Sequence, residues 1–95
     1  MKKVITSNLN LRLSLRIEPI ESEGVILRYF VKLIDSEQDD DKMNPLWIIE
    51  PIGEGTYQLT YEQLVVRGLV MFGSLSECLN YIKDECFKSA KYKAL

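Results

Sequence analysis

The chain has no histidine among its 95 residues. Histidine supplies the general base of most nucleophilic triads and is a common ligand of zinc and haem iron, so most schemes of these kinds are excluded. No glycine-rich phosphate loop is present either, because Gly53 and Gly55 are typical of a hairpin turn. We therefore predict no catalytic, cofactor-binding or metal-binding residues.

Cysteine is scarce, with only Cys78 and Cys86 in the chain. They are separated by eight positions of a predicted helix, which places them roughly 12 Å apart, too far for a disulfide between them. Both fall on the apolar side of that helix, where cysteine acts as a small hydrophobic residue. Two unpaired thiols are typical of a reducing compartment.

Long hydrophobic runs are also missing. No apolar run approaches the roughly 18 residues of a membrane-spanning helix. After Met1, the basic residues Lys2 and Lys3 are followed by only Val4 and Ile5 before polar residues resume, so no hydrophobic region of a secretory signal is present. We expect a cytoplasmic protein with no membrane partner.

The chain lacks an excess of positive charge, since its formal net charge is -2. The charges are unevenly distributed: residues 1–34 hold six basic and three acidic side chains, residues 35–45 one and five, and residues 46–95 five and six. Any affinity for nucleic acid would therefore have to be local.

Alternation of apolar and polar residues is the clearest pattern present. It runs from Leu9 to Glu18 and from Val25 to Ile34, with the apolar residues at odd positions in both segments. This predicts two paired strands with one apolar face, joined by a connection over 18–24. The expected register aligns Leu13 with Tyr29, and a shift of two residues would preserve the faces.

A second hairpin is predicted over 46–49 and 56–61, with its turn at Gly53–Gly55. The segment 60–73 admits two interpretations. Thr60 and Gln63 match a helix capping box, which would give a single helical turn over 61–64, whereas the following apolar residues favour a buried strand broken at Gly68. We favour the strand.

A helix is predicted over 75–92, because Ser74 and Glu77 form a capping box ahead of apolar residues on one helical face. The sequence thus predicts a single α+β domain over 1–95. Its antiparallel sheet would have four to five strands in two hairpins, with one C-terminal amphipathic helix packed on one face. The expected neighbours of the helix are Leu13, Leu15, Tyr29 and Val31.

The other face of the first hairpin is basic and contains one aromatic residue. As a candidate binding surface it comprises Arg12, Arg16, Arg28, Phe30 and Lys32. Three interpretations remain open: ordinary solvated charges with Phe30 in a second small core, a protein contact, or a surface for single-stranded nucleic acid.

The segment 35–45 is predicted to be an exposed acidic loop. Its candidate contact residues for a basic partner are Asp35, Glu37, Asp39, Asp40 and Asp41. A calcium loop of the EF-hand type is excluded, because Asp40 and Leu46 stand where that loop requires glycine and glutamate. Trp47, Tyr57 and Tyr61 are expected in the core, the alternative being an aromatic interface patch.

These observations favour a small non-enzymatic interaction protein, a regulator or inhibitor that binds another protein or a second copy of itself. By analogy, the small proteins of phages and mobile elements are of this kind. The alternative is a nucleic-acid-binding module that uses the basic hairpin face. The third and least favoured hypothesis is a small enzyme with a carboxylate or tyrosine site.

Overall fold

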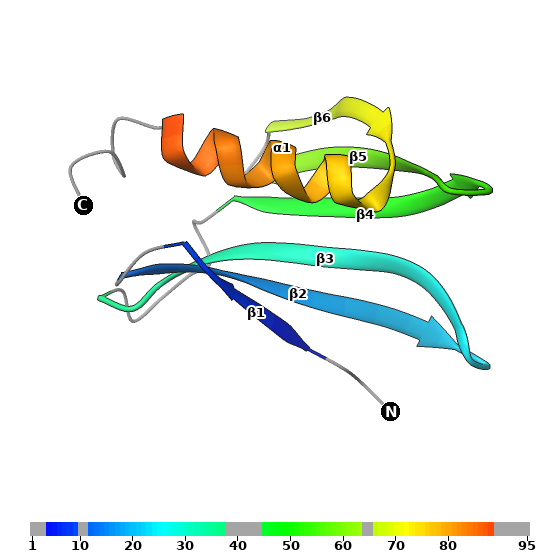
Figure 1. Cartoon of the computed structure of the whole chain (residues 1–95), viewed down its shortest axis with the longest axis horizontal. Helices are drawn as coiled ribbons and strands as arrows, with labels where there is room; N and C mark the ends of the chain where they lie inside the picture. Colours follow the sequence, from blue (N-terminus) through cyan, green and yellow to red (C-terminus); the bar gives the residue numbers. More distant parts are fainter. Residues whose placement is uncertain (1–3, 10–11, 38–44, 64–65, 89–95) are drawn as a thin grey trace.

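The computed structural model describes residues 4–9, 12–37, 45–63 and 66–88 (Figure 1). They form one six-stranded antiparallel sheet in which every strand pairs with its neighbours in the chain, followed by one helix. The elements are β1 (Ile5–Asn8), β2 (Leu13–Ser22), β3 (Val25–Asp35), β4 (Leu46–Gly53), β5 (Thr56–Gln63), β6 (Val66–Gly73) and α1 (Leu75–Lys88). The predicted α+β class is confirmed, but the sheet has six strands rather than four or five.

The additional strand is β1, which the alternating pattern concealed. Leu9 and Arg12 are not in a strand, so the predicted strand over 9–17 is wrong in its first part. The Leu9 N–H donates to the Leu13 carbonyl oxygen over 3.0 Å, in the connection that turns β1 back along β2. Ile5 then pairs with Ile17 at the edge of the sheet.

The first long hairpin has a different register from the one predicted. Leu15 pairs with Leu33, six positions beyond the expected partner, although this even shift keeps the same faces together. The causes are the turn, which occupies only Glu23 and Gly24 at φ of 53° and 78°, and a bulge at Leu27 of β3 that makes the shift even. Positive φ at both positions is typical of a tight primed hairpin turn. The predicted connection over 18–24 is therefore wrong, because β2 continues to Ser22.

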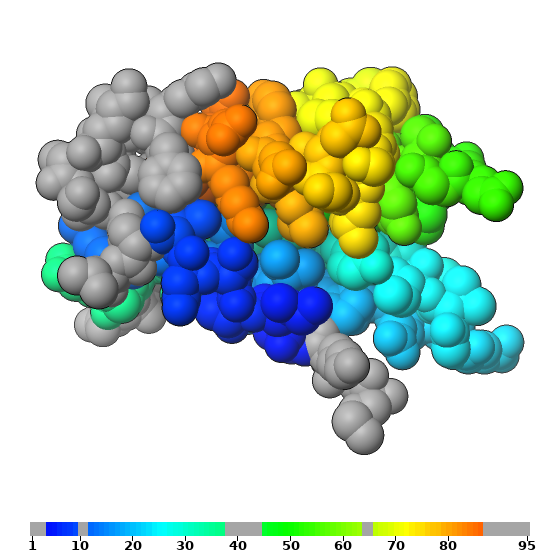
Figure 2. Space-filling model, in the orientation of Figure 1, coloured from blue at the N-terminus to red at the C-terminus, as the bar shows by residue number. Residues whose placement is uncertain are grey.

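The two long hairpins separate near their tips. Among the described residues, the pairing of β3 with β4 ends at Tyr29 and Ile49, and Figure 2 shows the cyan and green tips projecting apart. Val25 and Leu27, which the alternation placed on the apolar face, are consequently 61% and 45% exposed. Their exposure corrects the prediction that the whole face is core.

The strand interpretation of the segment 60–73 is confirmed, but β6 is not the buried strand predicted, since Val66, Leu69 and Phe72 are more than half exposed. Tyr61 pairs with Gly68 and Gln63 with Val66, so β5 and β6 form a third hairpin and Gly68 does not break the strand. The alternative, a helical turn over 61–64, is wrong for residues 61–63, because these residues belong to β5. Leu64 lies outside the described residues.

The capping box of α1 is confirmed. The Ser74 N–H donates to Glu77 Oε1 over 2.9 Å, and the Glu77 N–H donates to Ser74 Oγ over 3.1 Å. These bonds to Ser74 lower the pKa of Glu77. The described helix ends at Lys88, and the predicted continuation over 89–92 lies outside the described residues.

The helix lies against β4, β5 and β6 rather than against the first hairpin (Figure 1). The predicted neighbours on β2 and β3 are therefore not on the strands closest to α1, although Leu13, Leu15 and Val31 share a buried cluster with its Cys78, Ile82 and Cys86. Only Ser74 separates β6 from α1, and so short a connection keeps consecutive elements adjacent. The buried apolar side chains nevertheless form one cluster, which comprises Leu13, Leu15, Ile17, Val31, Leu33, Trp47, Ile49, Leu59, Cys78, Ile82 and Cys86.

Candidate functional site

The helix covers one side of the sheet, and we call the opposite side the outer face. It carries the residues that alternate with the buried ones on β2 to β5, together with Arg67, Leu69 and Phe72 of β6. No described element packs on it. Of the predicted basic surface, Arg16 and Lys32 are direct cross-strand partners on this face, with Phe30 and Arg28 further along β3.

The centre of the outer face is an apolar row. Phe30 pairs with Ile48, Ile48 pairs with Thr60, and Thr60 pairs with Leu69. Leu69 is 57% exposed, and the neighbouring Phe72 is 54% exposed. Large apolar groups gathered on an uncovered sheet face are typical of a contact surface.

Charges of both signs surround this row. Arg28 Nη2 lies 3.9 Å from Glu50 Oε2, and Arg67 Nη2 lies 3.1 Å from Glu62 Oε1. Glu18 is the direct partner of Phe30 on the side toward β2. The outer face is therefore a mixed ionic surface, and less basic than the hairpin sequence alone suggests.

Arg12 does not belong to the outer face. Its Nε and Nη2 donate to Asp35 Oδ1 and Oδ2 over 2.7 and 2.8 Å, in a two-pronged ion pair. The Ser36 N–H also donates to the Arg12 carbonyl oxygen over 2.9 Å. These hydrogen bonds join Arg12, which lies between β1 and β2, to the end of β3.

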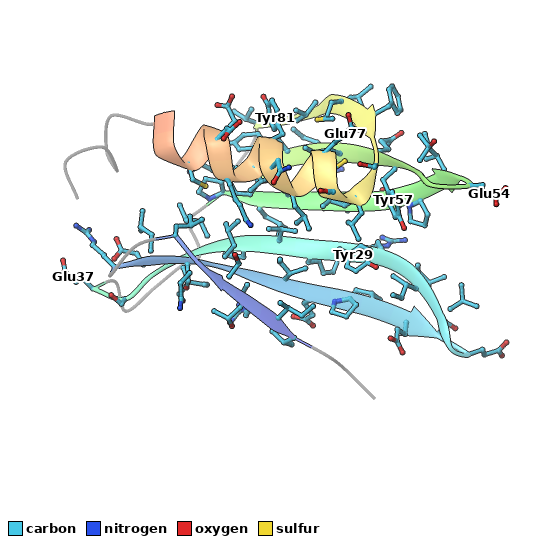
Figure 3. All side chains as sticks on the ribbon, in the orientation of Figure 1. Tyr29, Glu37, Glu54, Tyr57, Glu77 and Tyr81 are labelled. Carbon is cyan, nitrogen blue, oxygen red and sulfur yellow. The ribbon has the colours of Figure 1, made fainter. Side chains whose placement is uncertain are left out.

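Asp35 is only 4% exposed, so its assignment to an exposed acidic loop is wrong. Glu37 is exposed at the end of the molecule opposite Glu54 (Figure 3), with its carboxylate 3.5 Å from Arg12 Nε. Asp39, Asp40 and Asp41 lie outside the described residues. Within the described part of the chain, no group of three metal-ligating side chains occurs.

Four aromatic residues pack in two pairs on the inner side of the sheet. Trp47 and Tyr61 meet edge to face, with ring centroids 5.7 Å apart, and Tyr29 and Tyr57 are 6.4 Å apart. Trp47 is buried, as predicted, whereas Tyr57 and Tyr61 are half-buried.

A pocket of about 580 Å³ opens beside the Trp47–Tyr61 pair. The sequence interpretation missed it, because it depends on where the helix lies. The only sequence signal is a glycine inside a strand, Gly68, which is one of its lining residues.

Both cysteines are buried and free, as predicted. Burial is the main cause that raises the pKa of Cys78, and it raises the pKa of Cys86 to about 11. Folding thus favours the neutral thiol of Cys86. The resulting contribution to the stability of the fold is complete below the ordinary thiol pKa of 9.0 and is lost as the pH rises toward about 11.

We predict that iodoacetamide alkylates neither cysteine readily in the native protein at neutral pH, because the reactive thiolate is both rare and shielded. Mass spectrometry should show two rapid modifications once guanidinium chloride unfolds the chain. Native alkylation at the rate of a free thiol would contradict the burial of these groups.

None of the described helices is long and apolar enough to cross a membrane. Comparison of the chain with protein-family models, with curated proteins and with solved structures gave no match.

Proposed function

We propose that this chain is a non-enzymatic interaction protein, a regulator or inhibitor, that binds a protein partner through the outer face. The apolar row of Phe30, Ile48 and Leu69 on an uncovered sheet carries this proposal. Its two buried free thiols fit action in the cytoplasm.

The distribution of charge favours a protein over a nucleic acid. A phosphate backbone is attracted by uncompensated positive charge, whereas Arg28 and Arg67 each lie beside a carboxylate. An apolar centre with a rim of both charge signs suits a protein surface, where such pairs select the partner and its orientation.

The test substitutes Phe30 with aspartate and compares it with Ile52→Asp. Ile52 is 52% exposed on the β4–β5 hairpin tip, so the second variant introduces the same charge away from the apolar row. We expect size-exclusion chromatography with light scattering to detect any self-association, and affinity capture with the chain as bait to isolate any other protein partner. Phe30→Asp should weaken the complex at least about tenfold, and Ile52→Asp should not.

A folded Phe30→Asp protein that binds its partner as tightly as the unmodified chain would overturn the proposal. So would a strictly monomeric protein that captures nothing with either terminus attached to the support. Circular dichroism of each variant separates lost binding from lost folding.

The nucleic-acid alternative has its own outcome. It requires an oligonucleotide to bind at low salt and to be released by Arg16→Glu combined with Lys32→Glu, two residues that pair directly on the outer face. This result would replace the protein partner with a nucleic acid at the same surface.

A further inference from the structure

The pocket beside α1 lies on the helix side of the sheet and extends to the β6 edge. Its volume of about 580 Å³ is within the range of small-molecule sites, roughly 300–1,000 Å³. The lining residues used below are Trp47, Tyr61, Gln63, Gly68, Tyr81 and Glu85, together with Arg67, whose position in the register belongs to the outer face.

Three aromatic rings from three different elements line this space. Trp47 of β4 and Tyr61 of β5 meet edge to face at 64°, and Tyr61 is half-buried whereas Trp47 is only 4% exposed. Tyr81 of α1 lies beside β5 and β6 (Figure 3) and provides the third ring. Aromatic faces arranged around one space attract cations through their electron-rich rings.

The polar groups of the pocket also favour positive charge in a ligand. Glu85 lies one helical turn after Tyr81 and also lines the pocket, so its carboxylate places negative charge there. Arg67, the one basic residue among the described residues that line the pocket, lies 3.1 Å from Glu62, which offsets its charge. Gln63 adds a carbonyl oxygen, which accepts a hydrogen bond from the Tyr61 hydroxyl over 2.5 Å.

Gly68 keeps the pocket open at the position opposite Tyr61. A Cβ atom built there would meet nothing within 4 Å, so backbone packing does not require glycine. Glycine weakens the interior of a strand and often marks a bulge or a close approach by a ligand, and β6 has a bulge at Val70, two residues further on. Gly68 therefore borders open space in the pocket without being required there by backbone packing.

We propose that this pocket binds an organic cation, an alkylated ammonium group held by the three rings and the Glu85 carboxylate. Such a group occurs both in free metabolites of the choline type and on methylated lysine side chains. Phe30 and Ile48 of the outer face do not line the pocket, whereas Arg67 and Leu69 at the β6 edge do.

Trp47 is the only tryptophan of the chain and lines the pocket, so its fluorescence reports on occupancy. Titrations would use choline, its neutral isostere dimethylbutanol, and a peptide containing trimethyllysine. We expect saturable binding of at least one cation, about tenfold tighter than that of the neutral isostere. Choline binding would indicate a free ligand, and binding of the peptide alone would indicate a modified protein.

Three variants assign the binding to this pocket. Gly68→Val should fill the space and abolish binding while leaving the circular dichroism spectrum unchanged, with Gly68→Ala as a smaller step. Glu85→Gln should weaken cation binding about tenfold, whereas Glu54→Gln, at the far hairpin tip (Figure 3), should have no effect.

Equal affinity for choline and dimethylbutanol would overturn the proposal, as would undiminished binding by folded Gly68→Val or no saturable signal with any cation. Phe30→Asp should leave the titration unchanged. Failure of this inference is therefore distinguishable from failure of the proposed outer-face function.

Discussion

Replacement of Ile82 by alanine is expected to lower the free energy of unfolding by about 3 kcal/mol. Ile82 has 0% exposure in the middle of α1, within the cluster that unites the helix with the sheet. Truncation removes buried apolar atoms and leaves a cavity that the sheet on one side and the helix backbone on the other prevent from closing.

For a domain whose total stability is of the order of 5–15 kcal/mol, this loss is large. It should appear in urea unfolding followed by Trp47 fluorescence, and as a fall in Tm of the order of 15 °C. Ile52→Ala is the matched control, because the same atoms are removed from a side chain that is 52% exposed. Its cost should stay below about 0.5 kcal/mol, and an equal effect of the two substitutions would contradict the position of α1 over the core.

Removal of the Asp35 carboxylate is the second large effect expected. Asp35→Ala should cost about 2 kcal/mol, because it removes both acceptors of the Arg12 guanidinium and one acceptor of the Glu37 N–H. The figure is below that of a fully buried pair, since the Arg12 side chain is 33% exposed and is partly solvated after the change.

A double-mutant cycle with Arg12→Ala isolates the ion pair. The cost of the two substitutions together should be smaller than the sum of the single costs, by about 1 kcal/mol or more. Asp84→Ala, at an exposed position of α1, controls for the loss of one negative charge. Strictly additive costs at Arg12 and Asp35 would show that the two side chains do not stabilise the fold jointly.

The sequence predicted which side of β2, of β5 and of β3 from Tyr29 onward faces the core, because the alternation of apolar residues determines facing directly. It did not predict the register, because Pro19 lacks an N–H donor and therefore favours a connection over 18–24. Proline cannot donate a hydrogen bond to a neighbouring strand. At position 19 this costs β2 nothing on the β1 side, because among the described residues the pairing with β1 extends only as far as Ile17. The strand β1 gave no signal because its four residues bury almost no apolar surface.

For the candidate surfaces too, local alternation predicted the facing of side chains but not the contacts between distant parts of the chain. Alternation correctly placed Arg16, Phe30 and Lys32 on one face. The pairing of Arg12 with Asp35 joins residues 23 positions apart, which no local pattern indicates. The pocket also escaped prediction, because its walls meet only when α1 lies over β4 to β6.

The position of α1 in the chain affects how the protein emerges from the ribosome. All six strands are synthesised before the helix that supplies Cys78, Ile82 and Cys86 to the shared core. At about 5–20 residues per second, the 14 residues of α1 take roughly 1–3 s to synthesise. A nascent sheet would expose its apolar side during that interval, so aggregation and chaperone capture should compete with helix docking more strongly during translation than during refolding of the complete chain.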